Sequence, residues 1–140
     1  MDNIKLFVAV KAFVTNSRGE VLLLRESSKY KDGTNSGKYD IVGGRINPGE
    51  RFDDSLLREI KEETGLTVQI RKPFYVGEWR PEVRGEKWQV VATFFECVAD
   101  SEEVNLGEDH DSYIWIDPKE YKSYDIINDL QPAFEAYLDR

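Results

Sequence analysis

Residues 52–64 form the segment that most constrains how this chain folds. Leu56 and Ile60 recur at helical spacing and give the segment one apolar stripe, which has to pack against a core. Two aspartates stand in the first turn, where carboxylates suit the positive end of the helix dipole, and Gly65 follows as a terminator. The pattern therefore predicts an amphipathic helix over residues 52–64 that docks on a larger apolar surface.

Three glutamates, Glu59, Glu62 and Glu63, stand beside this stripe. At 3.6 residues per turn they project from the helix within about 100° of arc. Like charges at this spacing repel one another, and burial strengthens the repulsion. A divalent cation would relieve it, and hard oxygen ligands suit Mg²⁺. The alternative is an ordinary solvated helix face, balanced by Arg58 and Lys61.

The rest of the chain is rich in short apolar runs that indicate β-strands. We expect strands over residues 5–15, 20–25, 39–42, 66–71, 74–79, 88–98 and 112–116. The first two flank a four-residue turn and predict a hairpin. Residues 27–38 indicate a polar loop, and residues 129–138 a closing helix. Strands around a few helices predict an α+β layered fold, and residues 1–140 contain no linker, so we expect a single domain.

Charge and apolar content exclude several classes of protein. The chain carries 19 basic and 27 acidic residues, a net charge of −8. It therefore lacks the basic footprint of a nucleic-acid or membrane-surface binder. No apolar run approaches the roughly 18 residues of a membrane span, and the N-terminus does not resemble a secretion signal, so we expect a cytoplasmic protein. The single cysteine, Cys97, lies in an apolar run and is expected to be a buried, inert thiol.

A longer motif surrounds the three glutamates. Gly44, Glu50 and the run from Arg58 to Leu66 follow the pattern G-x5-E-x7-R-E-U-x-E-E-x-G-U, where U is apolar. This is the complete Nudix box, so the sequence resembles the Nudix hydrolases at every defining position. The box covers 23 of 140 residues, and the order of the expected elements agrees across nearly the whole chain.

The resemblance implies an α/β/α sandwich with a mixed sheet, in which the box forms a loop–helix–loop. It also implies hydrolysis of a nucleoside diphosphate linked to another group, with Mg²⁺ or Mn²⁺ as cofactor. By carry-over, Glu59, Glu62 and Glu63 would be catalytic metal ligands, helped by a backbone carbonyl near Gly44. Arg58 would pair with Glu50 and organise the site.

The sequence departs from common family patterns at two places near the box. Many relatives have Trp-x-x-Pro before the double glycine, where this chain has residues 39–42. A helix-capping Ser or Thr is usual after Glu50, where Arg51 stands here. Neither departure touches the metal carboxylates, so both bear on nucleotide preference rather than on activity.

Five further residues are candidates for contacting the substrate. Asp109 precedes the only histidine, in a segment that resembles an acidic ligand-bearing segment of many relatives, and an exposed acidic turn is the alternative. Arg25 ends a strand where relatives often aim a cation at phosphate, although a plain surface arginine is equally compatible. Trp79, Arg80 and Arg84 could stack on or pair with a nucleotide, and the alternative for the tryptophan is packing against the sheet.

The substrate expected from the sequence is a nucleoside diphosphate joined to a sugar, such as ADP-ribose. Arg80 and Arg84 could meet a second phosphate, and Pro81 stands 15 residues after Leu66, as in the ADP-ribose-cleaving subgroup. The alternatives are nucleoside triphosphates, including oxidised deoxynucleotides, and dinucleoside polyphosphates. A non-catalytic nucleotide sensor would be expected to lose box glutamates, and none is missing. Either a monomer or a homodimer is compatible with the sequence.

Overall fold

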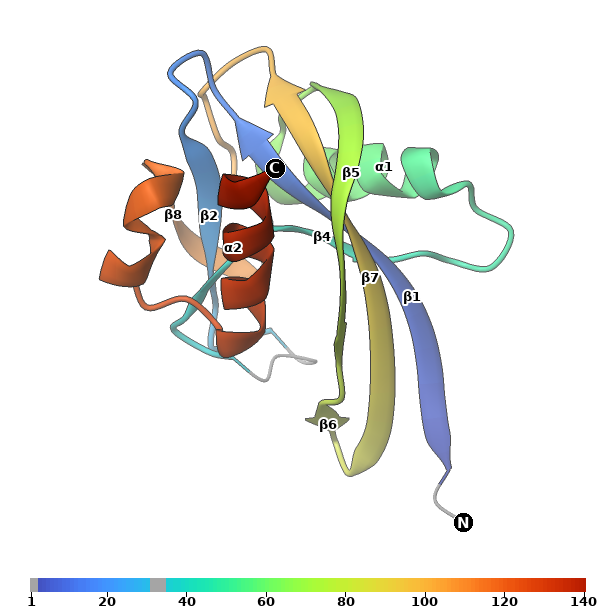
Figure 1. Cartoon of the computed structure of the whole chain (residues 1–140). Helices are drawn as coiled ribbons and strands as arrows, with labels where there is room; N and C mark the ends of the chain where they lie inside the picture. Colours follow the sequence, from blue (N-terminus) through green and yellow to red (C-terminus); the bar gives the residue numbers. More distant parts are fainter. Residues whose placement is uncertain (1–2, 31–34) are drawn as a thin grey trace.

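The computed structural model describes residues 3–30 and 35–140. Among the described residues, helix α1 interrupts the run of strands, and two short 3-10 helices and a final α-helix follow the last strand (Figure 1). The elements are β1 (Ile4–Thr15), β2 (Val21–Glu26), β3 (Tyr39–Asp40), β4 (Val42–Arg45), α1 (Phe52–Thr64), β5 (Val68–Trp79), β6 (Glu82–Val83), β7 (Glu86–Ala99), β8 (His110–Ile116), η1 (Pro118–Ser123), η2 (Asn128–Leu130) and α2 (Gln131–Asp139). The polar loop predicted for residues 27–38 lies partly outside the described residues, at 31–34.

Strand β1 is the centre of the sheet. It pairs in parallel with β7 along its whole length, from Ile4 opposite Lys87 to Thr15 opposite Val98. Its other edge pairs antiparallel with β4, while β2 joins it at a single position. The hairpin predicted from the first two strands is therefore formed only at its turn, and β2 pairs instead along β8. The second half of β1 is buried on both faces. Both of its edges pair with other strands.

Two cores, one on each face of the sheet, account for the layers. From β1, Val10 and Ala12 pack toward α1, whose Leu56 is fully buried in the same cluster. The alternate residue Phe13 packs on the opposite face against Phe134 of α2. Figure 1 shows α1 behind the sheet and α2 in front of it. The fold is an α/β/α sandwich with a mixed sheet, as predicted.

Three predicted strands differ from those observed. The strand expected over residues 39–42 is interrupted at Ile41, because β3 pairs with β2 whereas β4 pairs with β1. The strands expected before and after Pro73 are one strand, β5, whose register against β7 shifts on either side of that proline. Proline cannot donate a hydrogen bond to the neighbouring strand. Here the shifts in register accommodate Pro73 without ending β5.

Two smaller expectations are also tested by the described residues. Cys97 is buried in the α1-side core, and burial raises the pKa of its thiol to about 12, as expected for an inert residue. Among the described helices, none combines the length and the apolar character needed to cross a membrane.

Candidate active site

Helix α1 carries the expected glutamates and has the bounds that the sequence predicts. Gly65 ends it in the left-handed conformation, φ 73°, and its N–H donates to the carbonyl of Lys61. At the other end Arg51 provides no side-chain cap, and it instead pairs with Asp53. Because Leu56 and Ile60 are fully buried, the helix cannot rotate without losing core contacts, which fixes the direction of its acidic face.

The double glycine of β4 lies directly against this acidic face. A Cβ added to Gly44 would lie 2.7 Å from Cδ of Glu59, which is closer than carbon atoms approach in proteins. The N–H of Gly43 donates to Oε1 of Glu63 at 3.3 Å. Both glycines therefore bring backbone close to a box carboxylate, as the expected use of Gly44 requires.

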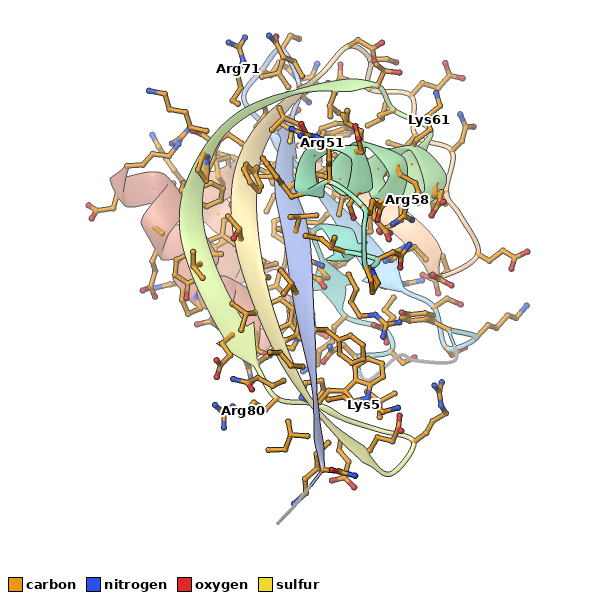
Figure 2. The ribbon with its side chains drawn as sticks, turned by 90° about the vertical axis from the view of Figure 1, so that its right-hand side faces the viewer. Lys5, Arg51, Arg58, Lys61, Arg71 and Arg80 are labelled. Atoms are coloured by element: carbon orange, nitrogen blue, oxygen red, sulfur yellow. The ribbon has the colours of Figure 1, made fainter. Side chains whose placement is uncertain are left out.

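Arg58 joins the loop before α1 to the helix. Its Nε and Nη2 donate to the two carboxylate oxygens of Glu50, at 2.8 and 3.0 Å, so the predicted pair is formed. The remaining Nη1 donates to Glu59 at 3.2 Å and to Glu62 at 3.3 Å. In Figure 2, Arg58 projects from the side of α1 that faces the lower half of the sheet. One guanidinium thus restrains three carboxylates at the mouth of the site.

Glu63 is the most buried of the three helix glutamates. Burial raises the pKa of its carboxyl well above the usual range, an effect that Lys11 opposes and Glu59 reinforces. Its Oε2 lies 3.8 Å from Nδ1 of His110, a buried nitrogen with no hydrogen-bond partner among the described residues. Burial also lowers the pKa of His110. A buried carboxyl and an orphaned ring nitrogen side by side indicate a polar site whose hydrogen bonding is incomplete.

The chemistry of these residues suits the binding of a hard divalent cation. In residues 3–30 and 35–140, no three acidic, His or Cys side chains already stand at metal-binding spacing, since Glu59 and Glu62 turn toward Arg58. The donors nevertheless are carboxylate oxygens beside a backbone that Gly44 leaves open, and Glu63 is a buried carboxyl with few partners. Oxygen donors of this kind suit Mg²⁺ or Mn²⁺.

A cleft of about 980 Å³ opens beside the helix. One part of its wall carries Glu59, Glu62 and Arg58, and another part is aromatic. In the aromatic part the guanidinium of Arg45 lies 4.7 Å from the ring centres of both Phe7 and Trp88. Carboxylates at one end and a cation on aromatic rings at the other could hold a charged group and a flat ring together.

The five residues proposed from sequence to contact substrate separate into two groups. Trp79 and Asp109 line the cleft. Arg25, Arg80 and Arg84 are not among the described residues that line it, and their contact with substrate stays a prediction. Arg25 pairs with Asp111 at 2.7 Å, whereas Arg80 pairs with Glu78.

The position of these arginines has a structural cause. Figure 2 shows Arg80 near the lower end of the sheet, away from α1. Arg84 lies in the tight turn between β6 and β7, with a left-handed φ of 49°. Strand register directs the side chains at this end of the sheet, and sequence spacing alone does not give the register. Arg80 does line a separate hollow of about 400 Å³, which shares Trp79 and Asp40 with the cleft.

The cleft also contains residues that the sequence reasoning missed. Arg45 had a local signal, because it directly follows the double glycine of the box. Lys11 had a weaker one, as a single cation within an apolar strand. Asp40 and Tyr30 gave none, because their place beside the cleft depends on strand pairing.

Comparison with known proteins agrees with this fold. The NUDIX domain profile matches residues 5–137, so the chain belongs to the Nudix family. It is a Nudix hydrolase, an enzyme that cleaves phosphorus anhydrides.

Individual relatives are informative about the subgroup. The chain is 32% identical over 97 residues to nucleoside triphosphatase NudI of Escherichia coli K12, a match that covers 64% of this chain and 69% of NudI. The crystal structure of a MutT protein from Methanosarcina mazei Go1 superposes with a TM-score of 0.83 at 28% identity, over 99% of this chain and 97% of that one. An Ap4A hydrolase from C. elegans, with a TM-score of 0.70 at 18% identity over 95% and 96% of the two chains, shares the fold.

Proposed function

We propose that the protein hydrolyses nucleoside triphosphates to a nucleoside monophosphate and pyrophosphate, with Mg²⁺ or Mn²⁺ held by Glu59, Glu62, Glu63 and the backbone near Gly44. One water is consumed for each phosphoanhydride bond that is broken. The observation that carries the proposal is one cleft lined both by Glu59 and Glu62 and by aromatic side chains, two of which lie under the guanidinium of Arg45. The similarity to NudI, a nucleoside triphosphatase by name, supports the same substrate class.

The metal and the residues around it have different roles in this reaction. The metal, when bound, neutralises charge on the phosphates and acidifies the attacking water. Arg58 orients Glu59 and Glu62, while Glu50 holds Arg58 in place. The aromatic wall with Trp79, Trp88 and Phe7 supplies apolar area for the nucleoside. Catalysis of this kind rests mainly on positioning and charge neutralisation, which a rigid helix and strand provide.

A second candidate substrate is a nucleoside diphosphate joined to a sugar. The supporting observation is the hollow beside the cleft, which Arg80, Glu82 and Asp129 line. Charged groups of both signs could bind sugar hydroxyls or a distal group there. This candidate ranks second, because the similarity to NudI, a nucleoside triphosphatase by name, supports triphosphates.

A panel of substrates tests both candidates. The rates to compare are kcat/KM values for the common nucleoside and deoxynucleoside triphosphates, 8-oxo-dGTP, ADP-ribose, other sugar nucleotides and Ap4A, each with Mg²⁺. We expect the best triphosphate to exceed ADP-ribose by about tenfold or more, which corresponds to about 1.4 kcal/mol of transition-state binding. A sugar nucleotide with a higher kcat/KM than every triphosphate would overturn the first proposal in favour of the second.

A further inference from the structure

Lys11 is an unusual residue in the second half of β1. Every residue from Ala9 to Val14 is buried, and Lys11 is only 8% exposed within this apolar run. An ammonium group is expensive to bury unless it is paired. Its position therefore requires both a path for the side chain and partners for the charge.

Gly43 provides the path. Strands β1 and β4 place it directly opposite Lys11, with φ at 140°. A Cβ on Gly43 would lie 2.7 Å from Cα and 3.0 Å from Cδ of Lys11, and 2.3 Å from the carbonyl oxygen of Val10. A side chain on Gly43 would therefore collide first with the backbone of β1 and also with the stem of Lys11, so only glycine allows this close pairing beside the lysine. Gly44, in contrast, lies against the carboxylate of Glu59.

Asp40 provides the partner. Its Oδ2 accepts a hydrogen bond from Nζ of Lys11 at 3.2 Å, while its Oδ1 accepts the N–H of Ile41 at 2.7 Å. The carboxylate is thus fixed to its own backbone and holds the ammonium in one direction. Both Lys11 and Asp40 line the cleft rather than the closed core. An ammonium has three donors, so the hydrogen bond to Asp40 leaves capacity for a ligand.

The charges around the cleft show where an anion could bind. Among the described residues that line it, Glu26, Glu50, Glu59, Glu62, Asp40 and Asp109 are acidic, and Lys11, Arg45 and Arg58 are cationic. Arg58 is committed to Glu50, Glu59 and Glu62. Arg45 lies over Phe7 and Trp88, toward the aromatic end. Lys11 lies against Gly43, whose N–H donates to Glu63, so the lysine stem runs beside a box carboxylate.

We infer that Lys11 is a substrate-binding residue whose ammonium, oriented by Asp40, donates to a non-bridging oxygen of the substrate's pyrophosphate group. This inference rests on the proposed function, because it requires a substrate that contains a pyrophosphate group. It does not depend on which nucleoside carries that group. The protein then holds the phosphates from two sides, through cation-binding carboxylates on α1 and through a fixed ammonium on β1. Asp40 is a positioning residue, because it acts only through Lys11.

Binding of imidodiphosphate, a non-hydrolysable analogue of pyrophosphate, tests the inference independently of the nucleoside. The variants are Lys11→Met and Asp40→Asn, with Lys5→Met as the matched control. Lys5 lies on the same strand and pairs with Glu86 at 2.6 Å, but it does not line the cleft. Titration calorimetry with saturating Mg²⁺ gives the dissociation constant of imidodiphosphate, and electron paramagnetic resonance gives the affinity for Mn²⁺ without phosphate.

We expect Lys11→Met to weaken imidodiphosphate binding by about tenfold or more, as for loss of a hydrogen bond to a charged group. Its kcat/KM should fall by about 100-fold, because the phosphates carry more charge to be stabilised in the transition state. Affinity for Mn²⁺ should remain within about twofold of wild type or increase. Asp40→Asn should raise KM and lower kcat less than Lys11→Met does, since the charge remains but is less well oriented.

Two results would overturn the inference: unchanged imidodiphosphate affinity in folded Lys11→Met, or an equal loss of affinity in Lys5→Met. Lys11→Gln, which keeps a donor for Asp40 without the charge, replaces Lys11→Met if the latter does not fold, and the same expectations apply. If wild-type protein binds imidodiphosphate through Lys11 but hydrolyses no nucleoside triphosphate, the proposed function fails while the inference stands. If the protein hydrolyses triphosphates and the lysine variants bind imidodiphosphate as wild type does, the inference fails while the proposed function stands.

Discussion

Arg58 donates two hydrogen bonds to Glu50, at 2.8 and 3.0 Å, across the turn that leads into α1. The carboxylate also accepts the N–H of Asn47 at 3.2 Å, so it closes the loop on itself and ties it to the helix. The same guanidinium reaches Glu59 and Glu62. The geometry of the loop and the orientation of the box carboxylates are therefore coupled through one side chain.

The first prediction concerns the pH dependence of stability through this pair. The hydrogen bonds from Arg58 are the main reason that the pKa of Glu50 falls from 4.5 to about 2. A lowered carboxyl pKa favours the folded state above pH 4.5, and this contribution disappears as the pH falls from about 4.5 to 2. We expect Glu50→Gln to have a lower Tm than wild type at pH 7, and the difference should shrink below about pH 4.5.

Thermal unfolding from about pH 2.5 to 7.5, followed by circular dichroism, gives this comparison. Glu135→Gln is the control, because Glu135 lies on the exposed side of α2, away from Arg58, and the Tm of this variant should follow that of wild type over the whole pH range. A Tm difference between Glu50→Gln and wild type that stays constant over the whole pH range would contradict the assignment.

The second prediction concerns the box carboxylates. Burial raises the pKa of the Glu63 carboxyl, because a negative charge is costly to bury. Glu63→Gln replaces this carboxyl with a neutral amide, so the Tm of the metal-free protein should stay the same or increase. Its kcat with Mg²⁺ should nevertheless fall by about 100-fold or more, because the cation loses a charged ligand. Glu62→Gln should lower kcat similarly. Glu135→Gln, on the exposed side of α2, is the control. Full activity of either box variant at saturating Mg²⁺ would refute the metal-ligand roles.

The third prediction separates activity from stability at Gly44. An alanine there is compatible with the backbone, because Gly44 does not have a positive φ. Its Cβ would meet the carboxylate of Glu59, which is the flexible end of a side chain and can move. We therefore expect Gly44→Ala to retain nearly wild-type Tm but to lose about 10- to 100-fold in activity or metal affinity, as for other changes that misorient a ligand. A large loss of Tm with unchanged activity would show that Gly44 has only a structural role.

The sequence was most informative where structure depends on short-range spacing. The bounds of α1, the cap at Gly65 and the pair between Glu50 and Arg58 were all predicted, since each rests on residues within one motif. The α+β class followed from the pattern of strands around a few helices, and the α/β/α sandwich followed from the resemblance to the Nudix hydrolases. The roles of Glu59, Glu62 and Glu63 in metal binding remain predictions.

What the sequence did not reveal depends on contacts between distant segments. Lys11 and Asp40 are 29 residues apart, and only the pairing of β1 with β4 makes room for the lysine beside Gly43. Pairing of β1 with β7 is likewise non-local, and a local pattern does not specify its register. The register of strands in the sheet decides which side chains of a loop reach the cleft.

The last prediction is that water attacks phosphorus directly, without a covalent enzyme intermediate. The described residues lining the cleft include no Cys, Ser or Thr, and Cys97 is buried in the α1-side core. The box carboxylates are assigned to the cation, and His110, which lines the cleft, has its Nδ1 3.8 Å from Oε2 of Glu63. With enzyme in excess over substrate, one turnover in ¹⁸O-labelled water should place one ¹⁸O in a phosphate product of every molecule cleaved. Mass spectrometry of the nucleoside monophosphate and the pyrophosphate identifies which phosphorus is attacked. Unlabelled products in that first turnover, with ¹⁸O appearing in a protein carboxylate, would instead establish a phosphoryl-enzyme intermediate.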